Sequence, residues 1–325
     1  MKALVTGSNG LIGSEIFREL GGLGLDNDMR KTFFGPEGST AQNASDNTLN
    51  CDIRDYGRIE ALFKAERFDT IIHCAAQPSH EASLSNPLLD FSINAEATVH
   101  LLEMTRTYCP DAVFIFVSTN KVYGDYPNRL PLVELETRYE FADCQGIDES
   151  CPIDQSTHTV FGVSKAAADL AVQEYGRTFG MKTVCFRCGC ITGRRQSGVP
   201  LHGFLNYACK AARESKEYTI LGYKGKQVRD NLHATDLVSA FVEYINNPRP
   251  GQVYNMGGEK RNSCSVLEMV GRLGLKTTYQ ENPRLGDHIC YYTNMAKFRK
   301  DYPLWQPRMT LDDIFEDLLW PCIDV

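Results

Sequence analysis

The sequence predicts an α/β fold in which helices cover both faces of a doubly wound parallel sheet, followed by a smaller C-terminal substrate-binding region. Short apolar runs alternate with amphipathic patterns through the first half of the chain, as expected where helices connect parallel strands. Runs such as VFIFVST are apolar without alternation, which is typical of strands buried on both faces. The third observation is a glycine-rich turn, VTGSNGLIG, directly after the first run.

The patterns assign the elements in order. We expect strands at 2–7, 70–76, 113–119 and 182–188. We expect helices at 11–20, 95–108 and 161–179, where apolar residues recur at three- and four-residue spacing. The pattern becomes irregular after Gly193, so we predict a sheet domain over 1–193 and a mainly substrate-binding region over 194–325. A helix and a strand predicted near 229–258 could return to the first sheet and join it.

Composition and charge exclude several classes of function. The 325 residues are 42% hydrophobic and 23% charged, which are ordinary globular proportions. A formal net charge of −7 gives no basic field for nucleic acid. No apolar run approaches the roughly 18 residues needed to span a bilayer, and the first strand begins too early for a signal peptide. We therefore expect a cytoplasmic protein that binds neither nucleic acid nor membrane.

The twelve cysteines are scattered through apolar runs, and none forms a C-x-x-C pair. A zinc site needs four convergent ligands, and a disulfide framework belongs to small secreted domains. We expect reduced thiols and no metal site.

Gly7, Gly10 and Gly13 stand between the first predicted strand and the first predicted helix. Glycines let the backbone turn tightly and approach a pyrophosphate, which then lies against the amides at the helix N-terminus. We therefore predict a dinucleotide site in this turn. Its residues are Gly7, Asn9, Gly10, Leu11, Ile12 and Gly13.

An acidic residue is expected about 20 residues beyond such a turn, where it binds the adenosine ribose. Asp26, with Asn27 beside it, is the best match, although it follows Gly13 by only about 13 residues. The first helix or the second strand must therefore be short. Arg30 could instead face the 2′-phosphate of NADP, but Asp26 would repel that group, so NAD is favoured over NADP.

Segments along essentially the whole chain resemble the extended short-chain dehydrogenase/reductases, a family of NAD-dependent nucleotide-sugar epimerases and dehydratases. The segments are VTGSNGLIG, CDIRD, IIHCAAQ, INAEATVHLLE, VSTNKVYGD, FGVSKAAAD, GKQVRDNLHATDL and VYNMGG. Within the family, STNKVYGD and GKQVRDNLH are most similar to a sugar 2-epimerase. The resemblance implies NAD as cofactor, a nucleotide-diphosphate sugar as substrate, and a homodimer formed through helices 95–108 and 161–179.

The resemblance also implies roles for individual residues. Lys165 would bond the nicotinamide ribose, and Thr119, with Ser118 beside it, would contact the reacting sugar oxygen. The remaining cofactor residues would be Asp52 and Ile53 at the adenine, with Ala75, Ala76, Gln77 and Asn94 along the dinucleotide. The substrate residues would be Asn120, Cys188, Cys190, His202, Arg229 and Arg284, the two arginines holding the diphosphate.

Two further segments bear on the expected site. The loop QPSHEAS follows a strand end, where ligands of such folds bind, so Gln77, Ser79 and His80 could face the substrate or lie in a solvated loop. Asp287 and His288 resemble the entry to a strand, with no obvious catalytic spacing.

The residues after Thr119 bear on the type of reaction. Dehydratases of the family carry an acidic pair there, whereas this chain has Asn120 and Lys121. An amide and an ammonium cannot replace two carboxyl groups in acid–base work. Dehydration is therefore disfavoured, and epimerisation or simple oxidation remains.

Phe161 stands four residues before Lys165, where the family has a tyrosine whose phenol takes the proton of the sugar hydroxyl. Phenylalanine can neither accept nor donate a proton, and loss of a general base costs roughly 3–6 kcal/mol of barrier. In one interpretation another group takes the proton, on this or a related nucleotide sugar. In the other, the chain is a regulatory or scaffold protein that binds NAD without catalysis. The candidate bases are Lys121, Tyr123, Cys188, Cys190 and His202.

Overall fold

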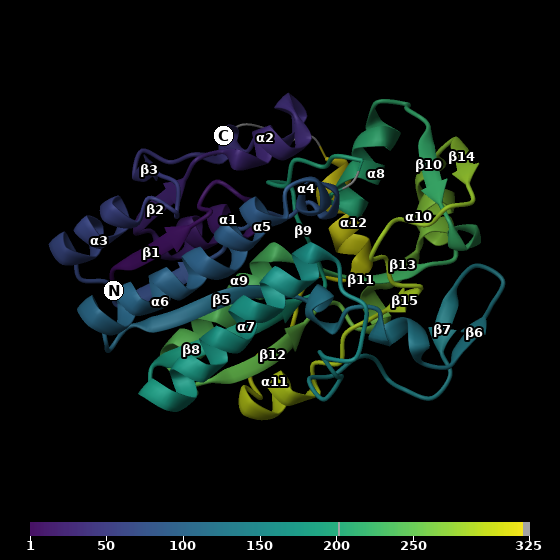
Figure 1. The fold of residues 1–325 in the computed structure, drawn as a ribbon. Helices are drawn as coiled ribbons and strands as arrows, with labels where there is room; N and C mark the ends of the chain where they lie inside the picture. The colour runs from purple at the N-terminus through teal and green to yellow at the C-terminus, as the bar shows by residue number, and fades with distance from the viewer. Residues whose placement is uncertain (201, 321–325) are drawn as a thin grey trace.

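The centre of the molecule is a seven-stranded parallel sheet with the order β12-β8-β5-β4-β1-β2-β3 (Figure 1). The structure is a computed structural model that describes residues 1–200 and 202–320. The strands are β1 (Ala3–Thr6), β2 (Leu23–Asp26), β3 (Thr48–Asn50), β4 (Thr70–His73), β5 (Val113–Thr119), β8 (Lys182–Cys188) and β12 (Gln252–Met256). The predicted doubly wound parallel sheet is confirmed.

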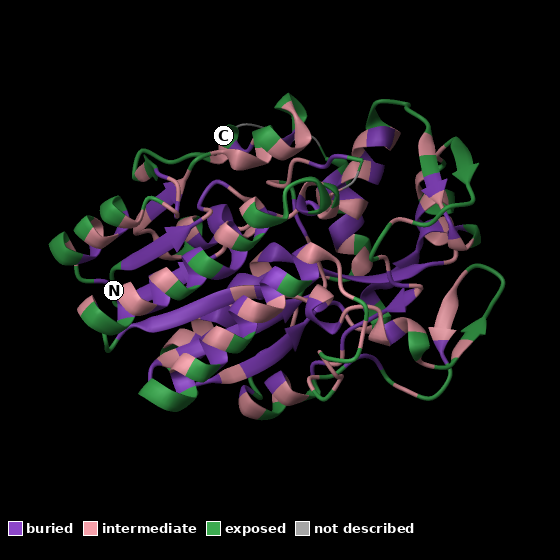
Figure 2. Ribbon diagram, in the orientation of Figure 1, coloured by how far each residue is buried: buried purple, intermediate pink, exposed green. Residues whose placement is uncertain are grey.

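Each face of the sheet is covered by its own helices and its own core. Successive residues of a strand point to opposite faces, so Leu4 and Ile71 enter one core while Val5 and Ile72 enter the other. Helices α3 (Tyr56–Ala65), α6 (Ala97–Tyr108) and α7 (Val160–Phe179) cover the first face, and α1 (Leu11–Leu20), α9 (Ala234–Asn246) and α11 (Ala296–Asp301) the second. Figure 2 shows the central strands β1, β4, β5 and β8 almost wholly buried and the outer surfaces of the helices exposed.

The C-terminal half contributes β12 to the main sheet and builds a smaller layer beyond the edge toward which the strands point (Figure 1). Its strands are β9 (Cys190–Thr192), β11 (Val228–His233), β13 (Ser263–Ser265) and β15 (Cys290–Tyr291), with a separate pair, β10 (Tyr218–Leu221) and β14 (Thr277–Gln280). Its helices α8 (Phe204–Arg213), α10 (Val266–Leu273) and α12 (Leu311–Leu319) share one apolar core.

Short elements fill the connections. The short helices are α2 (Met29–Phe34), α4 (His80–Ser85), α5 (Pro87–Phe91) and the π-helix η3 (Ser92–Glu96). The 3₁₀ helices are η1 (Pro36–Gly38), η2 (Ala41–Asn43), η4 (Asn120–Tyr123), η5 (Tyr126–Arg129), η6 (Tyr223–Gly225) and η7 (Lys260–Asn262). The strands β6 (Leu132–Glu134) and β7 (Tyr139–Phe141) form an antiparallel hairpin. The stretch between Gly13 and Asp26 is short, as expected, because α1 ends at Leu20 and β2 has four residues.

A buried ion pair joins α7 to the sheet. Arg187 of β8 donates to both oxygens of Asp169 of α7, at 2.7 and 3.1 Å. Ser118 donates to the same carboxylate at 2.6 Å, and Arg187 also donates to the Tyr123 oxygen at 3.1 Å. Both charges are therefore neutralised and hydrogen-bonded, which is the condition under which a buried pair is tolerated.

Removing one member of this pair leaves the other charge buried. We predict that Asp169→Ala lowers the free energy of unfolding by about 3–5 kcal/mol, measured by denaturant titration. The matched control is Glu214→Ala, which removes the solvent-exposed pair with Lys216 and is expected to cost less than about 1 kcal/mol. Equal, small losses in the two variants would show that Arg187 does not depend on Asp169.

Candidate functional site

A cavity of about 540 Å³ lies between the carboxyl edge of the main sheet and the C-terminal layer. The glycine turn lines this cavity, and so do residues of β11 and the loop around Arg284. The predicted site residues that line this cavity are Gly7, Gly10, Leu11, Ile12, Gly13, Asp26, Asn27, Asp52, Ile53, Ala75, Ala76, Ser118, Thr119, Asn120, Lys121, Phe161, Lys165, Cys188, Cys190, His202, Arg229 and Arg284.

Two glycines allow three backbone segments to touch at the dinucleotide end. Gly7 has φ of 69°, and a Cβ there would lie 2.7 Å from the Ala75 nitrogen. A Cβ on Gly13 would lie 2.1 Å from the Gly7 oxygen. The helix cap is Gly10, which has no side chain to bind the first amides of α1. Those amides are therefore available to a phosphate.

Asp26 lies where the strand β2 ends, beside the glycine turn. Its Oδ2 accepts a hydrogen bond from the Asn9 backbone at 2.9 Å, and its Oδ1 accepts one from the Asp28 backbone at 2.8 Å. Burial raises the pKa of Asp26, although these two hydrogen bonds act to lower it. Each oxygen keeps a further lone pair, which suits the two hydroxyls of a ribose.

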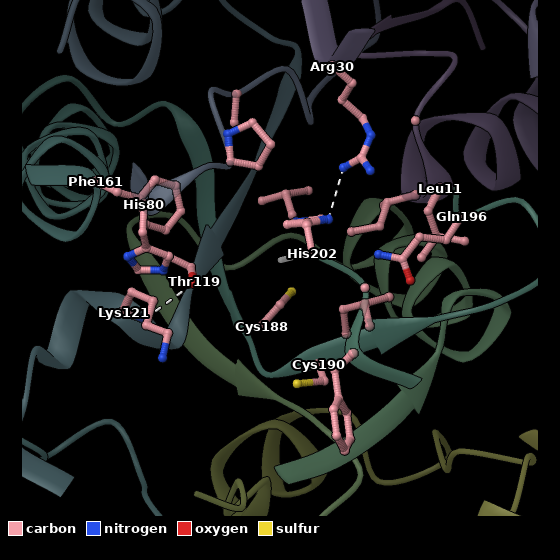
Figure 3. A pocket seen from close by; sticks show the side chains of 18 of the residues that line it. Leu11, Arg30, His80, Thr119, Lys121, Phe161, Cys188, Cys190, Gln196 and His202 are labelled. Atoms are coloured by element: carbon pink, nitrogen blue, oxygen red, sulfur yellow. Dashed lines mark hydrogen bonds between the residues drawn. The ribbon is translucent and has the colours of Figure 1, made fainter. Parts of the chain in front are cut away.

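Arg30 is held away from the Asp26 carboxylate by other partners. Its guanidinium donates to the Gly38 and Ser197 carbonyls at 3.2 and 2.9 Å, and to Nδ1 of His202 at 2.9 Å (Figure 3). The contacts with Ser197 and His202 join segments more than 150 residues apart beside the cavity. The Arg30 guanidinium is therefore engaged by the protein and is not free to bind a 2′-phosphate. This agrees with NAD, rather than NADP, as the cofactor.

Lys165 and Phe161 lie one turn apart on α7 and share the face that lines the cavity. Lys165 Nζ donates to the Val117 carbonyl at 2.9 Å and lies 4.0 Å from the centre of the Phe116 ring. Burial lowers the pKa of Lys165 to about 8. The Phe161 ring meets the imidazole of His80 edge to face, with 4.9 Å between ring centres (Figure 3).

Three cations gather at the far end of the cavity around one carboxylate. Arg229 forms an ion pair with Asp287, and Lys121 Nζ donates to the Gly286 carbonyl at 2.9 Å. Burial alone would raise the pKa of Asp287, but Arg229, Lys121 and Arg284 hold it at about 2. Asp287, which the sequence suggested only as the entry to a strand, thus lines the cavity. Its partner Arg229 is 58 positions away, so no local pattern reveals the pair.

Three predicted cofactor residues do not line the cavity. Asn9 acts through its backbone, on Asp26. Gln77 and Asn94 are buried and both donate to Oδ1 of Asp90, at 2.7 and 3.3 Å. A buried carboxylate needs such donors, so these amides hold the chain after β4 in place, and their contact with the cofactor stays a prediction. Ser118 lines the cavity, but its hydroxyl donates to Asp169.

Four of the five candidate bases are poorly suited to accept a proton. Tyr123 is buried outside the cavity lining, donates to Asn255 at 2.7 Å, and has a pKa raised by burial. Nδ1 of His202 is already occupied by Arg30, which leaves its other nitrogen protonated in the neutral ring. Burial raises the thiol pKa of Cys188 to about 12 and that of Cys190 to about 11. Of the five, Lys121 is left, with a pKa lowered by burial to about 8.

Residues 3–257 match the sequence profile of the NAD dependent epimerase/dehydratase family. The chain belongs to this family. NAD is accordingly its cofactor, and the residues present fit it: the open helix N-terminus, the close glycine contacts and the carboxylate of Asp26 are all in place. Asp52, expected at the adenine, is held by Arg54 at 2.7 Å, which lowers its pKa.

Known relatives match 96% of the chain. CDP-paratose 2-epimerase of Salmonella typhi is 36% identical over 331 residues, covering 96% of this chain and 96% of that protein. dTDP-glucose 4,6-dehydratase 1 of Escherichia coli K12 is 29% identical over 341 residues, covering 96% of this chain and 90% of that protein.

Two solved structures share the fold. Pal of Bacillus thuringiensis has a TM-score of 0.81 at 23% identity, covering 98% of both chains, and UDP-glucose 4-epimerase of Thermus thermophilus, complexed with NAD, has 0.77 at 24%, also covering 98% of both.

The described part of the chain shows no metal site, no disulfide and no membrane-spanning helix. No group of histidine, cysteine or acidic residues within 1–200 and 202–320 could hold a metal ion. Each cysteine in these ranges is a free thiol. No helix in them is long and apolar enough to cross a membrane.

The close contact at Gly13 gives a direct test of the cofactor end. We predict that Gly13→Ala greatly reduces the NAD that copurifies with the chain, because the added methyl would push α1 away from the Gly7 carbonyl. Bound NAD is measured after denaturation of the purified protein. Gly57→Ala is the matched control, since a Cβ at that helical position meets nothing within 4 Å. Full NAD occupancy in Gly13→Ala would contradict the proposed position of the pyrophosphate.

Proposed function

We propose that the chain is a nucleotide-sugar epimerase that acts by transient hydride transfer to tightly bound NAD, in the manner of a CDP-paratose 2-epimerase. The observation that carries the proposal is that one cavity is lined both by the glycine turn and by Arg229, Arg284 and Lys121. A dinucleotide and a second diphosphate can therefore occupy it together. The 36% identity to CDP-paratose 2-epimerase across 96% of the chain supports this type of substrate.

The substrate diphosphate takes the place of the Asp287 carboxylate on Arg229. The pair lies in the cavity, and guanidinium groups bind phosphate oxygens with the same geometry as carboxylates. Cys190 and His202 line the remaining space near the sugar. An anionic substrate is thus held by local cations although the whole chain has a net charge of −7.

Bound NAD supplies the hydride acceptor, and the chain supplies the surroundings of the sugar hydroxyl. Thr119 contacts the reacting oxygen, and Lys165 holds the nicotinamide ribose. Asn120 and Lys121 lack the two carboxyl groups that elimination would use, so the ketone is reduced again rather than dehydrated. Because Phe161 has no phenol, the acid–base group is not the usual one.

Phe161 also supports the second candidate function, a catalytically impaired NAD-binding regulatory or scaffold protein. That protein would keep the glycine turn and the cations but would turn nothing over. The two candidates differ in one measurable property, the stereochemistry of a bound nucleotide sugar.

The epimerase is tested with purified protein in deuterated buffer and CDP-, UDP- and dTDP-sugars, with sugar stereochemistry followed by NMR. We predict inversion at one carbon without incorporation of solvent deuterium there, because the same hydride leaves and returns. No turnover of any sugar, despite tight binding of NAD and a sugar nucleotide, would favour the regulatory protein.

A homodimer is proposed to form through α6 and α7. Val163 and Leu170 are two turns apart on α7, and each is nearly half exposed, at 49% and 48%. Val99 of the neighbouring α6 is also exposed, as are Leu88 and Phe91 of α5. Apolar side chains gathered over adjacent helices are typical of an interface.

The cytoplasmic location expected from the sequence stays a prediction.

The dimer is tested by sedimentation at micromolar concentration. We predict that the wild type has the mass of two chains and that Leu170→Glu has the mass of one, because a carboxylate would be buried between the helices. Val133→Glu is the control, since Val133 is similarly exposed, at 45%, but lies on β6, far from α6 and α7 (Figure 1). A monomeric wild type would rule the interface out.

A further inference from the structure

His80 occupies the space beside Phe161. It begins α4, directly after the loop that follows β4, and its imidazole lines the cavity. The two rings meet edge to face with 4.9 Å between their centres. Figure 3 shows His80 on the same side of the cavity as Phe161, Thr119 and Lys121. A nitrogen base is thus placed next to the ring that lacks a phenolic oxygen.

The orientation of this imidazole is fixed by the residue that caps α7. Nδ1 of His80 is hydrogen-bonded to the Thr159 hydroxyl at 3.0 Å, and the same oxygen accepts the Gly162 amide at 3.2 Å. When Nδ1 carries the proton and donates it to Thr159, Nε2 has a free lone pair. Within residues 1–200 and 202–320, no hydrogen bond of the protein occupies Nε2.

We propose that His80 is the acid–base residue of the reaction, in place of the phenol that Phe161 lacks. The proposal rests on the epimerase function proposed above. As the sugar C–H bond breaks and its hydrogen leaves with the electron pair to NAD, the O–H bond breaks and its proton passes to Nε2 of His80, leaving a ketone. In the return step the hydride enters the other face of the ketone, and His80 gives the proton back to the oxygen.

The charges around His80 link its basicity to substrate binding. Burial, then Lys121 of η4 and Arg284 of the loop before β15, lower its pKa to about 3, while Asp287 of the same loop acts in the opposite direction. The elements packed against the ring also include α7, through Thr159 and Phe161, and the segment with His202, which is neutral and bound to Arg30. The free protein therefore holds a neutral imidazole. A diphosphate on Lys121 and Arg284 neutralises the two cations and raises the pKa of His80.

Lys121 is less well placed for the same task. Its ammonium donates to the Gly286 carbonyl at 2.9 Å and belongs to the cluster with Arg229 and Asp287. A lysine in that cluster binds the diphosphate as a cation, and a cation cannot at the same time accept a proton.

The test compares wild type, His80→Asn, Phe161→Tyr and the double variant His80→Asn/Phe161→Tyr. His80→Asn is expected to lower kcat for epimerisation by roughly 10²- to 10⁴-fold, the range for loss of a general base, with bound NAD and the Kd of the sugar nucleotide unchanged. The double variant is expected to recover activity, because a phenol returns to the position beside Thr119 and Lys165. A merely structural role for His80 would not be rescued by a phenol at position 161.

The pH dependence gives a second readout. In the wild type, kcat is expected to fall toward acid pH as His80 becomes protonated in the substrate complex, and this acid limb should be absent in the double variant. His100→Asn is the control, since His100 of α6 stacks on Tyr56 of α3 and does not line the cavity. An active wild type with equally active His80→Asn overturns the inference and leaves the epimerase standing. A wild type that turns over no sugar overturns the epimerase and the inference with it.

Discussion

The contact between Gly7 and Gly13 is the constraint on which the rest of the site depends. Only glycine lets the end of β1, the first turn of α1 and the backbone after β4 come together, since a Cβ at either position would lie within 3 Å of another main-chain atom. This contact places the open amides of α1 at the edge of the sheet. It also brings the Asn9 amide to Asp26, which positions the ribose carboxylate from the neighbouring strand.

The reacting end of the cavity depends on a second set of fixed contacts beneath it. The pair of Asp169 and Arg187 ties α7 to β8, and Lys165 is held one turn away on the same helix by the Val117 carbonyl. The Thr159 hydroxyl caps α7 and binds His80. The helix α7 therefore sets the positions of Lys165, of Phe161 and of the His80 imidazole. An acid–base group on α4, in place of a tyrosine on α7, accordingly needs no change in the fold.

Local chemistry made much of this predictable from the sequence. The glycine turn, the helix with Phe161 and Lys165, and the end of β2 at Asp26 each depend on residues close together in the chain. Contacts between residues distant in sequence were not predictable. Nothing local shows that Gln77 and Asn94 both bind the buried Asp90, and their place along the cofactor stays a prediction.

The same reason explains the residues that the sequence left open. Asp287, in the loop before β15, is held in the site by its ion pair with Arg229 of β11. Tyr123 is hydrogen-bonded to Arg187 and Asn255, so it is a poor candidate base. The sequence places His80 at the ligand edge of the sheet, but its contact with Phe161, 81 positions away, exists only in the folded chain.

The central claim, that a sugar carbon is oxidised and reduced again by one hydride, is tested most directly with a nucleotide sugar deuterated at the carbon that inverts. The account predicts that the labelled substrate reacts more slowly than the unlabelled one, because the C–H bond breaks, and that the product keeps its deuterium in water. Inversion at an unchanged rate, with the label lost to solvent, would contradict it and show that the proton, not the hydride, is exchanged at that carbon.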